Sequence, residues 1–226
     1  MNIGIIGSGN IGSTLARYLT DLGHSVVIAN SRGPESLGKI AAETGAIPVT
    51  AEEAAGAGDI VIIAIPEKAI VHLPIAILAA SKAIIVDAGN YYPSRDGHNV
   101  AIENGLTDSE WVAQVLGHSV VKAFNNILAS SLASKAAPEG SDNRIALSIA
   151  GNDEQEKQVV MKLIDSIGFE AIDGGTLSES WRQQPGEQAY CRDLDKETLE
   201  TALQNADLRQ RAANLAKADE QARPYF

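Results

Sequence analysis

The sequence contains a single cysteine, Cys191, among 226 residues. One thiol cannot form an internal disulfide, so nothing in the chain calls for an oxidising compartment. Long apolar runs are also missing, because the longest, Ile60 to Pro66, is far shorter than the roughly 20 residues that cross a bilayer. The N-terminus lacks the basic and apolar regions of a secretory signal. These absences predict a soluble, cytoplasmic protein with no membrane partner.

Basic residues are in deficit. The chain has 18 Lys and Arg against 29 Asp and Glu, a formal net charge of −11. A surface of this sign repels nucleic acid, so we expect no nucleic-acid partner. The 4 histidines show no spacing that would place two on one helix face, and no metal site is expected.

Short β-branched runs alternate with helical segments through the first two thirds of the chain. Strands are predicted at residues 2–6, 25–29, 46–49, 59–65, 83–87, 119–124 and 145–150. Helices are predicted between the first two strands and at residues 67–80, 108–116, 128–135, 153–167 and 198–217. Most strands are apolar on both faces, which is typical of a doubly wound, mostly parallel α/β sheet. We assign this sheet to residues 1–175, and a C-terminal helical extension packed on the same domain to residues 176–226.

The most informative motif is a glycine-rich turn directly after the first strand. It is a G-x-G-x-x-G made of Gly7, Ser8, Gly9, Asn10, Ile11 and Gly12. In a dinucleotide-binding turn the first glycine permits the tight turn, the second lets a pyrophosphate approach the backbone, and the third lets helix and strand pack closely. The helix that follows offers free N–H groups to the anion. The motif therefore predicts a dinucleotide site of the Rossmann type.

The residues after the second strand predict which dinucleotide binds. NAD-binding proteins usually place a carboxylate there for the ribose hydroxyls. Here the strand is followed by Asn30, Ser31 and Arg32. These side chains can donate to a phosphate, and a guanidinium suits bidentate contact, so the sequence predicts NADP(H).

Other candidate residues follow the later strands, whose carboxyl ends should border the ligand crevice. Ala64, Ile65 and Pro66 close one strand, and Gly89 and Asn90 follow the next. We expect both segments to flank the nicotinamide. The remaining candidates lie near an expected acceptor and are Tyr92, Ser94, Asn125 and Asn126. The roles of two further residues remain open. Asp87 either caps a helix or touches ligand, and Lys122 either donates to a substrate or extends to solvent at a sheet edge.

The order of four motifs resembles a known family. They are residues 7–12, residues 30–32, the stretch from Val120 to Ile127, and the stretch from Asp173 to Leu177. Over about residues 1–180 they are similar to the NADP-dependent reductases of the deazaflavin coenzyme F420, whose Rossmann domain is shared by the six-transmembrane metalloreductases. The resemblance implies direct hydride transfer between nicotinamide and a flavin-like or deazaflavin ring. It also implies that Ala123 to Asn125 lie on the nicotinamide side of the acceptor pocket.

Two other functions remain open from the sequence. The first ~65 residues also resemble pyrroline carboxylate reductases and hydroxyacid dehydrogenases, which would make the substrate a small imine or carbonyl. A regulator that binds NADP without turnover is the other alternative. In either enzymatic case we expect residues 180–193 to cover the acceptor, on their own subunit or across a homodimer.

Overall fold

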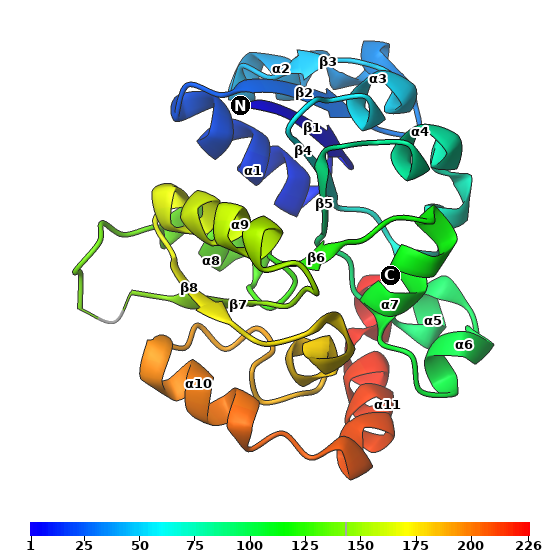
Figure 1. The fold of residues 1–226 in the computed structure, drawn as a ribbon, viewed down its shortest axis with the longest axis vertical. Helices are drawn as coiled ribbons and strands as arrows, with labels where there is room; N and C mark the ends of the chain where they lie inside the picture. The colour runs from blue at the N-terminus through cyan, green and yellow to red at the C-terminus, as the bar shows by residue number, and fades with distance from the viewer. Residues whose placement is uncertain (143) are drawn as a thin grey trace.

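A six-stranded parallel sheet forms the centre of the molecule, with strand order β3-β2-β1-β4-β5-β6. The computed structural model describes residues 1–142 and 144–226 (Figure 1). The strands are β1 (Asn2–Ile6), β2 (Ser25–Ala29), β3 (Ile47–Pro48), β4 (Ile60–Ile63), β5 (Ile84–Asp87) and β6 (Val121–Lys122). This order is that of a Rossmann fold, so the predicted fold class is confirmed.

Helices cover both faces of this sheet (Figure 1). One face packs against α1 (Asn10–Asp21), α2 (Gly38–Thr44), α8 (Ala129–Ser134) and α9 (Glu154–Ile167). The other packs against α3 (Ala51–Ala55), α4 (Ile75–Ala79) and α7 (Asp108–Leu116). Successive residues of a strand point to opposite faces, so Ile5 and Ile6 enter different cores. This explains the continuous apolar runs.

Local signals set several helix ends. Helix α1 is followed by Gly23 at φ 82°, the left-handed conformation expected at that glycine. Helix α7 begins at a capping box in which the Thr107 side chain accepts from the Glu110 backbone N–H. The Asp153 carboxylate caps α9 in the same way, by accepting from two backbone N–H groups. The sequence predicted α7 with its exact bounds and α9 to within one residue.

Two predicted long helices are broken in the structure. Residues 67–80 form a 3-10 helix, η2 (Glu67–His72), and the separate α4. Leu73 is extended between them because a residue before proline avoids the helical region. Residues 198–217 likewise divide into α10 (Lys196–Gln204), η4 (Leu208–Gln210) and α11 (Arg211–Ala222). The Asp207 carboxylate accepts the Arg209 backbone N–H and starts a new helix there.

The expected seventh strand does not continue the main sheet. It forms β7 (Ala146–Ile149), which pairs in parallel with β8 (Glu170–Asp173), a strand that the sequence did not predict. The two sheets meet at one antiparallel bridge between Lys122 and Ala150. After β6 the chain turns at Phe124, which is fully buried at φ 61°. This left-handed turn directs the chain away from the line of the main sheet.

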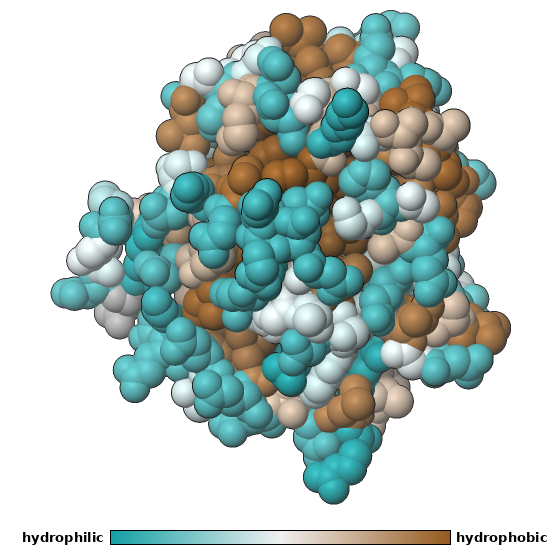
Figure 2. Space-filling model, in the orientation of Figure 1, coloured by the Kyte–Doolittle hydropathy of each residue, from teal (hydrophilic) through white to brown (hydrophobic). Residues whose placement is uncertain are grey.

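The C-terminal extension packs on the small second sheet. Leu199 and Leu203 of α10 are buried against Ala146 and Ile172. The shorter elements are η1 (Pro34–Leu37), α5 (Pro93–Asp96), α6 (Val100–Glu103), η3 (Leu177–Gln183) and η5 (Arg223–Tyr225). On the face shown in Figure 2, apolar colour gathers between α1 and α9, whereas the surface over α9 is mainly hydrophilic. None of the helices in the described part of the chain is long and apolar enough to span a bilayer.

Candidate functional site

The glycine turn joins β1 to the N-terminus of α1, and its three glycines differ in the space around them. A Cβ on Gly7, whose φ is +121°, would lie 2.2 Å from the Ala64 carbonyl oxygen. A Cβ on Gly12 would lie 1.9 Å from the Gly7 carbonyl oxygen. A Cβ on Gly9 would meet nothing within 4 Å. The outer glycines therefore allow close packing, and the middle one faces open space at the helix N-terminus, which fits a pyrophosphate.

A hydrogen-bonded network connects this turn to the end of β2. The Asn30 amide donates to the Ser8 hydroxyl at 3.2 Å and to the Ser36 hydroxyl at 2.9 Å. Its carbonyl oxygen accepts the Arg32 backbone N–H at 2.9 Å. The Asn30 side chain thus shapes the loop, while Ser31 and Arg32 are exposed beyond it. Ser36 belongs to this network and was not singled out in the sequence, although its serine is only six residues after Asn30.

The ends of β4, β5 and β6 lie side by side at the same edge of the sheet. Ala64 still bonds to β1, because its N–H donates to the Ile6 carbonyl at 2.8 Å. Pro66 then ends the pairing and is the N-cap residue of η2. Gly89 has little free space, since a Cβ there would lie 3.1 Å from Asp87 and 3.2 Å from Glu67. Residues 64–66, 89–90 and 123 therefore form one continuous border, as the strand order requires.

A buried charge cluster lies under this border. The Lys122 ammonium is fully buried and contacts Asp87 at 3.1 Å, Asp108 at 3.3 Å and the Gly89 carbonyl oxygen at 2.7 Å. Burial alone lowers the pKa of Lys122, but the carboxylates of Asp108, Asp87 and Glu67 outweigh it, and the pKa lies above its usual value. The interpretation that Lys122 extends to solvent at a sheet edge was wrong, because its three donors are all used inside the protein.

Asp87 belongs to the same cluster and holds the start of α7. Its carboxylate accepts from the Ser109 hydroxyl at 2.6 Å and from the Gly89 N–H at 2.9 Å. Of the two interpretations left open for this residue, the structure shows the buried carboxylate next to a helix terminus. Its role is to fix the loop that follows β5.

Glu67 is the unpaired member of the cluster. It is 1% exposed, and neither carboxylate oxygen has a hydrogen-bond partner. Burial raises the pKa of Glu67 well above its usual value of 4.5, and the nearby charges of Asp87, Asp108 and Asp96 raise it further while Lys122 opposes them. The side chain is therefore neutral over a pH range in which an exposed glutamate is charged.

We predict that Glu67→Gln becomes increasingly more stable than the wild type as pH rises above 4.5. Above that value the unfolded chain releases a proton that folded Glu67 keeps, so wild-type stability falls with pH until the folded pKa is passed. The difference in free energy of unfolding should grow by at most about 1.4 kcal/mol per pH unit. Urea unfolding of both proteins at pH 5 and pH 8 measures it. An unchanged difference would show that Glu67 is ionised in the fold.

The four residues expected near an acceptor all contact the C-terminal extension. Asn125, 2% exposed, donates to the Gln183 carbonyl at 2.8 Å and accepts from the Gln183 amide at 2.8 Å. Asn126, 4% exposed, donates to the Ala189 carbonyl at 3.3 Å. Both asparagines are thus used in holding residues 183–191 over the end of β6. Residues 183–191 belong to the segment 180–193, which we expect to cover the acceptor.

Tyr92 and Ser94 contact the extension from the other side. The Tyr92 hydroxyl lies 2.9 Å from the Tyr190 hydroxyl. Ser94 donates to the Asp219 carboxylate of α11 through both its N–H and its hydroxyl. The sequence had paired none of these residues, because each pair is about 100 or more positions apart. The only sign of this contact in the sequence was the presence of aromatic residues at Tyr92 and Tyr190 in a chain that has few of them.

Fold and site together define the class of the protein. A Rossmann sheet and a glycine turn with an open middle position at a helix N-terminus are the parts of a dinucleotide-binding protein. The ends of β4, β5 and β6 lie along the same edge of the sheet as this turn.

Comparison with known proteins narrows this class to a family. Residues 2–91 match the model of the family described as NADP oxidoreductase, coenzyme F420-dependent. Hypothetical protein SMa0349 from Sinorhizobium meliloti is 34% identical, with a TM-score of 0.72 over 87% of this chain and 96% of that one. The "putative F420 dependent NADP-reductase" of Arthrobacter sp. FB24 is 25% identical, with a TM-score of 0.67 over 80% and 87% of the two chains.

A curated relative is Metalloreductase STEAP3 of Rattus norvegicus, 26% identical over 179 residues, which are 79% of this chain and 34% of that protein. The Escherichia coli protein YjhV is 42% identical over 62 residues, 27% of this chain and 45% of that protein. The chain thus spans less than half the length of the curated relatives it matches. It belongs to the family of coenzyme F420-dependent NADP oxidoreductases.

Proposed function

We propose that the protein is an NADP(H)-dependent oxidoreductase that transfers a hydride between NADPH and a flavin-like or deazaflavin acceptor such as coenzyme F420. The observation that carries the proposal is the glycine turn, whose middle position is open while its neighbours are closed. Membership of the family supports the acceptor class.

The residues present fit the cofactor. Gly9 leaves the helix N-terminus free for the pyrophosphate, and Ser31 and Arg32 would hold a 2′-phosphate. NADPH supplies the hydride, and reduction of the acceptor consumes one proton from water. The protein's part is orientation: Ala64 to Pro66, Gly89, Asn90 and Ala123 would bound the nicotinamide, and residues 183–191 would exclude water.

We predict that Arg32→Ala weakens NADPH binding by about 1.5–3 kcal/mol and leaves NADH binding nearly unchanged, because only NADPH carries the phosphate that the guanidinium would contact. Titration of both nucleotides measures the difference. Arg209→Ala is the control, since it removes the same charge from an exposed residue of the extension. Equal losses for NADPH and NADH would contradict the assignment of the 2′-phosphate site.

Oxidation of NADPH with F420, FMN and FAD offered in turn tests the proposed activity. Turnover with at least one of them is expected. An NADP-binding regulator would instead bind NADPH tightly and oxidise it with none of them, and a reductase of small imines would leave all three acceptors unreduced.

We also propose a homodimer in the cytoplasm, which ultracentrifugation and fractionation would test.

A further inference from the structure

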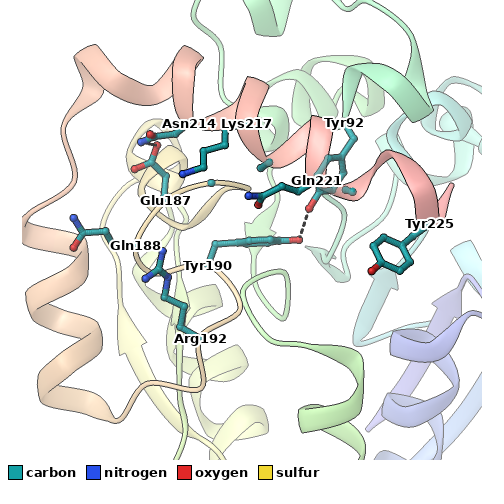
Figure 3. Close-up of a pocket in the computed structure, with 12 residues that line it drawn as sticks. Tyr92, Glu187, Gln188, Tyr190, Arg192, Asn214, Lys217, Gln221 and Tyr225 are labelled. Carbon is teal, nitrogen blue, oxygen red and sulfur yellow. Dashed lines mark hydrogen bonds between the residues drawn. The ribbon is translucent and has the colours of Figure 1, made fainter.

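A pocket lies between the 184–193 segment and helix α11. Its volume is about 650 Å³, within the range of small-molecule sites. Figure 3 shows its lining side chains, which come from two regions of the extension and, in the case of Tyr92, from the loop after β5. Neither the glycine turn nor the 2′-phosphate residues contribute to it. A second ligand could therefore enter while the dinucleotide occupies its own site.

Two tyrosines on this pocket hold each other in place. The hydroxyls of Tyr92 and Tyr190 are hydrogen-bonded, and Figure 3 shows the Tyr190 ring lying across the pocket. Burial raises the pKa of both phenols, so both remain neutral. A fixed aromatic ring of this kind offers a flat apolar surface against which a planar ligand can stack.

Two basic residues, Arg192 and Lys217, line the same pocket. Their charged ends lie on one side of it in Figure 3. Three basic residues outside the pocket have acidic partners: Lys135 pairs with Asp193, Arg209 with Asp207 and Arg223 with Asp219. Within the described residues, Arg192 and Lys217 have no such partner. In a chain of net charge −11, two unpaired cations at one pocket favour an anionic ligand.

The acidic residue of the pocket, Glu187, forms no ion pair with Arg192 or Lys217 among the described residues. Glu187 is 3% exposed and accepts from the Asn214 amide at 3.1 Å. Burial raises the pKa of Glu187, while the hydrogen bond from Asn214 and the charge of Arg211 oppose the rise. The remaining polar residues, Gln188, Asn214 and Gln221, are uncharged.

The pocket begins close to the expected nicotinamide. Tyr92 follows Asn90 by two residues, so their Cα atoms are at most about 7 Å apart. Cys191, next to Tyr190, donates its N–H to the Asn126 carbonyl at the end of β6. A planar ligand on Tyr190 would thus lie near the border where the hydride leaves the cofactor.

We infer that this pocket is the acceptor site and that it selects a planar acceptor with an anionic tail, a phosphate or carboxylate, held by Arg192 and Lys217. The inference rests on the proposed function for its ligand class and adds the recognition of the tail. FMN and riboflavin share one ring and differ by a terminal phosphate, which makes them a matched pair of probes. F420 is the third probe and distinguishes the source of the anion.

The test measures dissociation constants of the three probes in the presence of saturating NADP⁺. The proteins are the wild type, Arg192→Gln, Lys217→Gln and the double variant, with Lys162→Gln on the exposed surface of α9 as the charge-matched control. Thermal melting confirms that each is folded. Each single variant should weaken FMN about fivefold, the upper range for a solvent-exposed ion pair, and the double variant about twentyfold. Riboflavin should change less than twofold.

Salt gives an independent readout. Raising NaCl should weaken FMN but not riboflavin in the wild type, and this difference should disappear in the double variant. If the double variant binds only FMN more weakly, or only F420 more weakly, the proposal is supported and the recognised tail is identified. Wild-type FMN and F420 binding by the double variant, or an equal loss for riboflavin, would overturn it. So would riboflavin binding as tightly as FMN and F420 in the wild type.

Failure of the proposed function has a different signature. Tail-dependent binding without NADPH oxidation would contradict the activity and leave the anion site standing. Turnover that is indifferent to Arg192 and Lys217 would contradict the anion site and leave the activity standing.

Discussion

Gly9→Val should abolish binding of NADPH and NADH while the protein remains folded. A valine there would fill the space at the N-terminus of α1 that the pyrophosphate needs. Its Cβ would meet no protein atom within 4 Å, and the backbone at φ −73° and ψ −173° suits a β-branched residue. Nucleotide titration with circular dichroism and thermal melting measures both parts of the expectation.

Gly58→Val is the matched control for this variant. A Cβ on Gly58 is also free of contacts within 4 Å, and this glycine precedes β4 at the opposite edge of the sheet. It should bind both nucleotides as the wild type does. A folded Gly9→Val protein with wild-type affinity would place the dinucleotide elsewhere.

Lys122→Met should lower the free energy of unfolding by about 3–5 kcal/mol, because it leaves buried carboxylates without their cation. Asp87 and Asp108 contact the Lys122 ammonium directly, and both are at most 1% exposed. For a chain of this size the change corresponds to a melting temperature lower by roughly 6–20 °C. Denaturant unfolding at pH 7 measures it.

Two further variants show whether charge is the cause. Lys39→Met removes an exposed lysine paired with Glu43 and should cost less than about 1 kcal/mol. Adding Asp108→Asn to Lys122→Met should recover part of the lost stability, since one uncompensated charge is removed. No recovery would mean that the loss comes from packing of the lysine side chain instead.

The parts of the fold that the sequence predicted depend on neighbouring residues. The glycine turn, the apolar strands and the capping residues Thr107 and Asp153 act over a few positions, and the corresponding elements form as expected. Strand β8 was missed because it contains two acidic residues in four and pairs with β7 only after the chain has passed through α9. Pairing of that kind depends on tertiary contacts that local pattern does not contain.

The candidate site also has parts that the sequence predicted and parts that it did not. The turn and the donors after β2 could be identified from sequence, although their contacts with a cofactor stay predictions. The cluster of Glu67, Asp87, Asp108 and Lys122 could not, because its members come from four separate segments. A lysine in an apolar strand was the visible sign of it. The tyrosine pair, 98 residues apart, is beyond any local rule.

During translation, the pocket beside α11 forms after the central sheet. Apart from Tyr92, its lining lies entirely within residues 186–225. A nascent chain that has left the ribosome up to about residue 180 can already contain the glycine turn and the central strands, but not this pocket. The pocket therefore forms only after the residues of the central sheet have been made. Exchange of residues 186–225 would change eleven of the twelve lining residues and leave the glycine turn and the central strands unchanged.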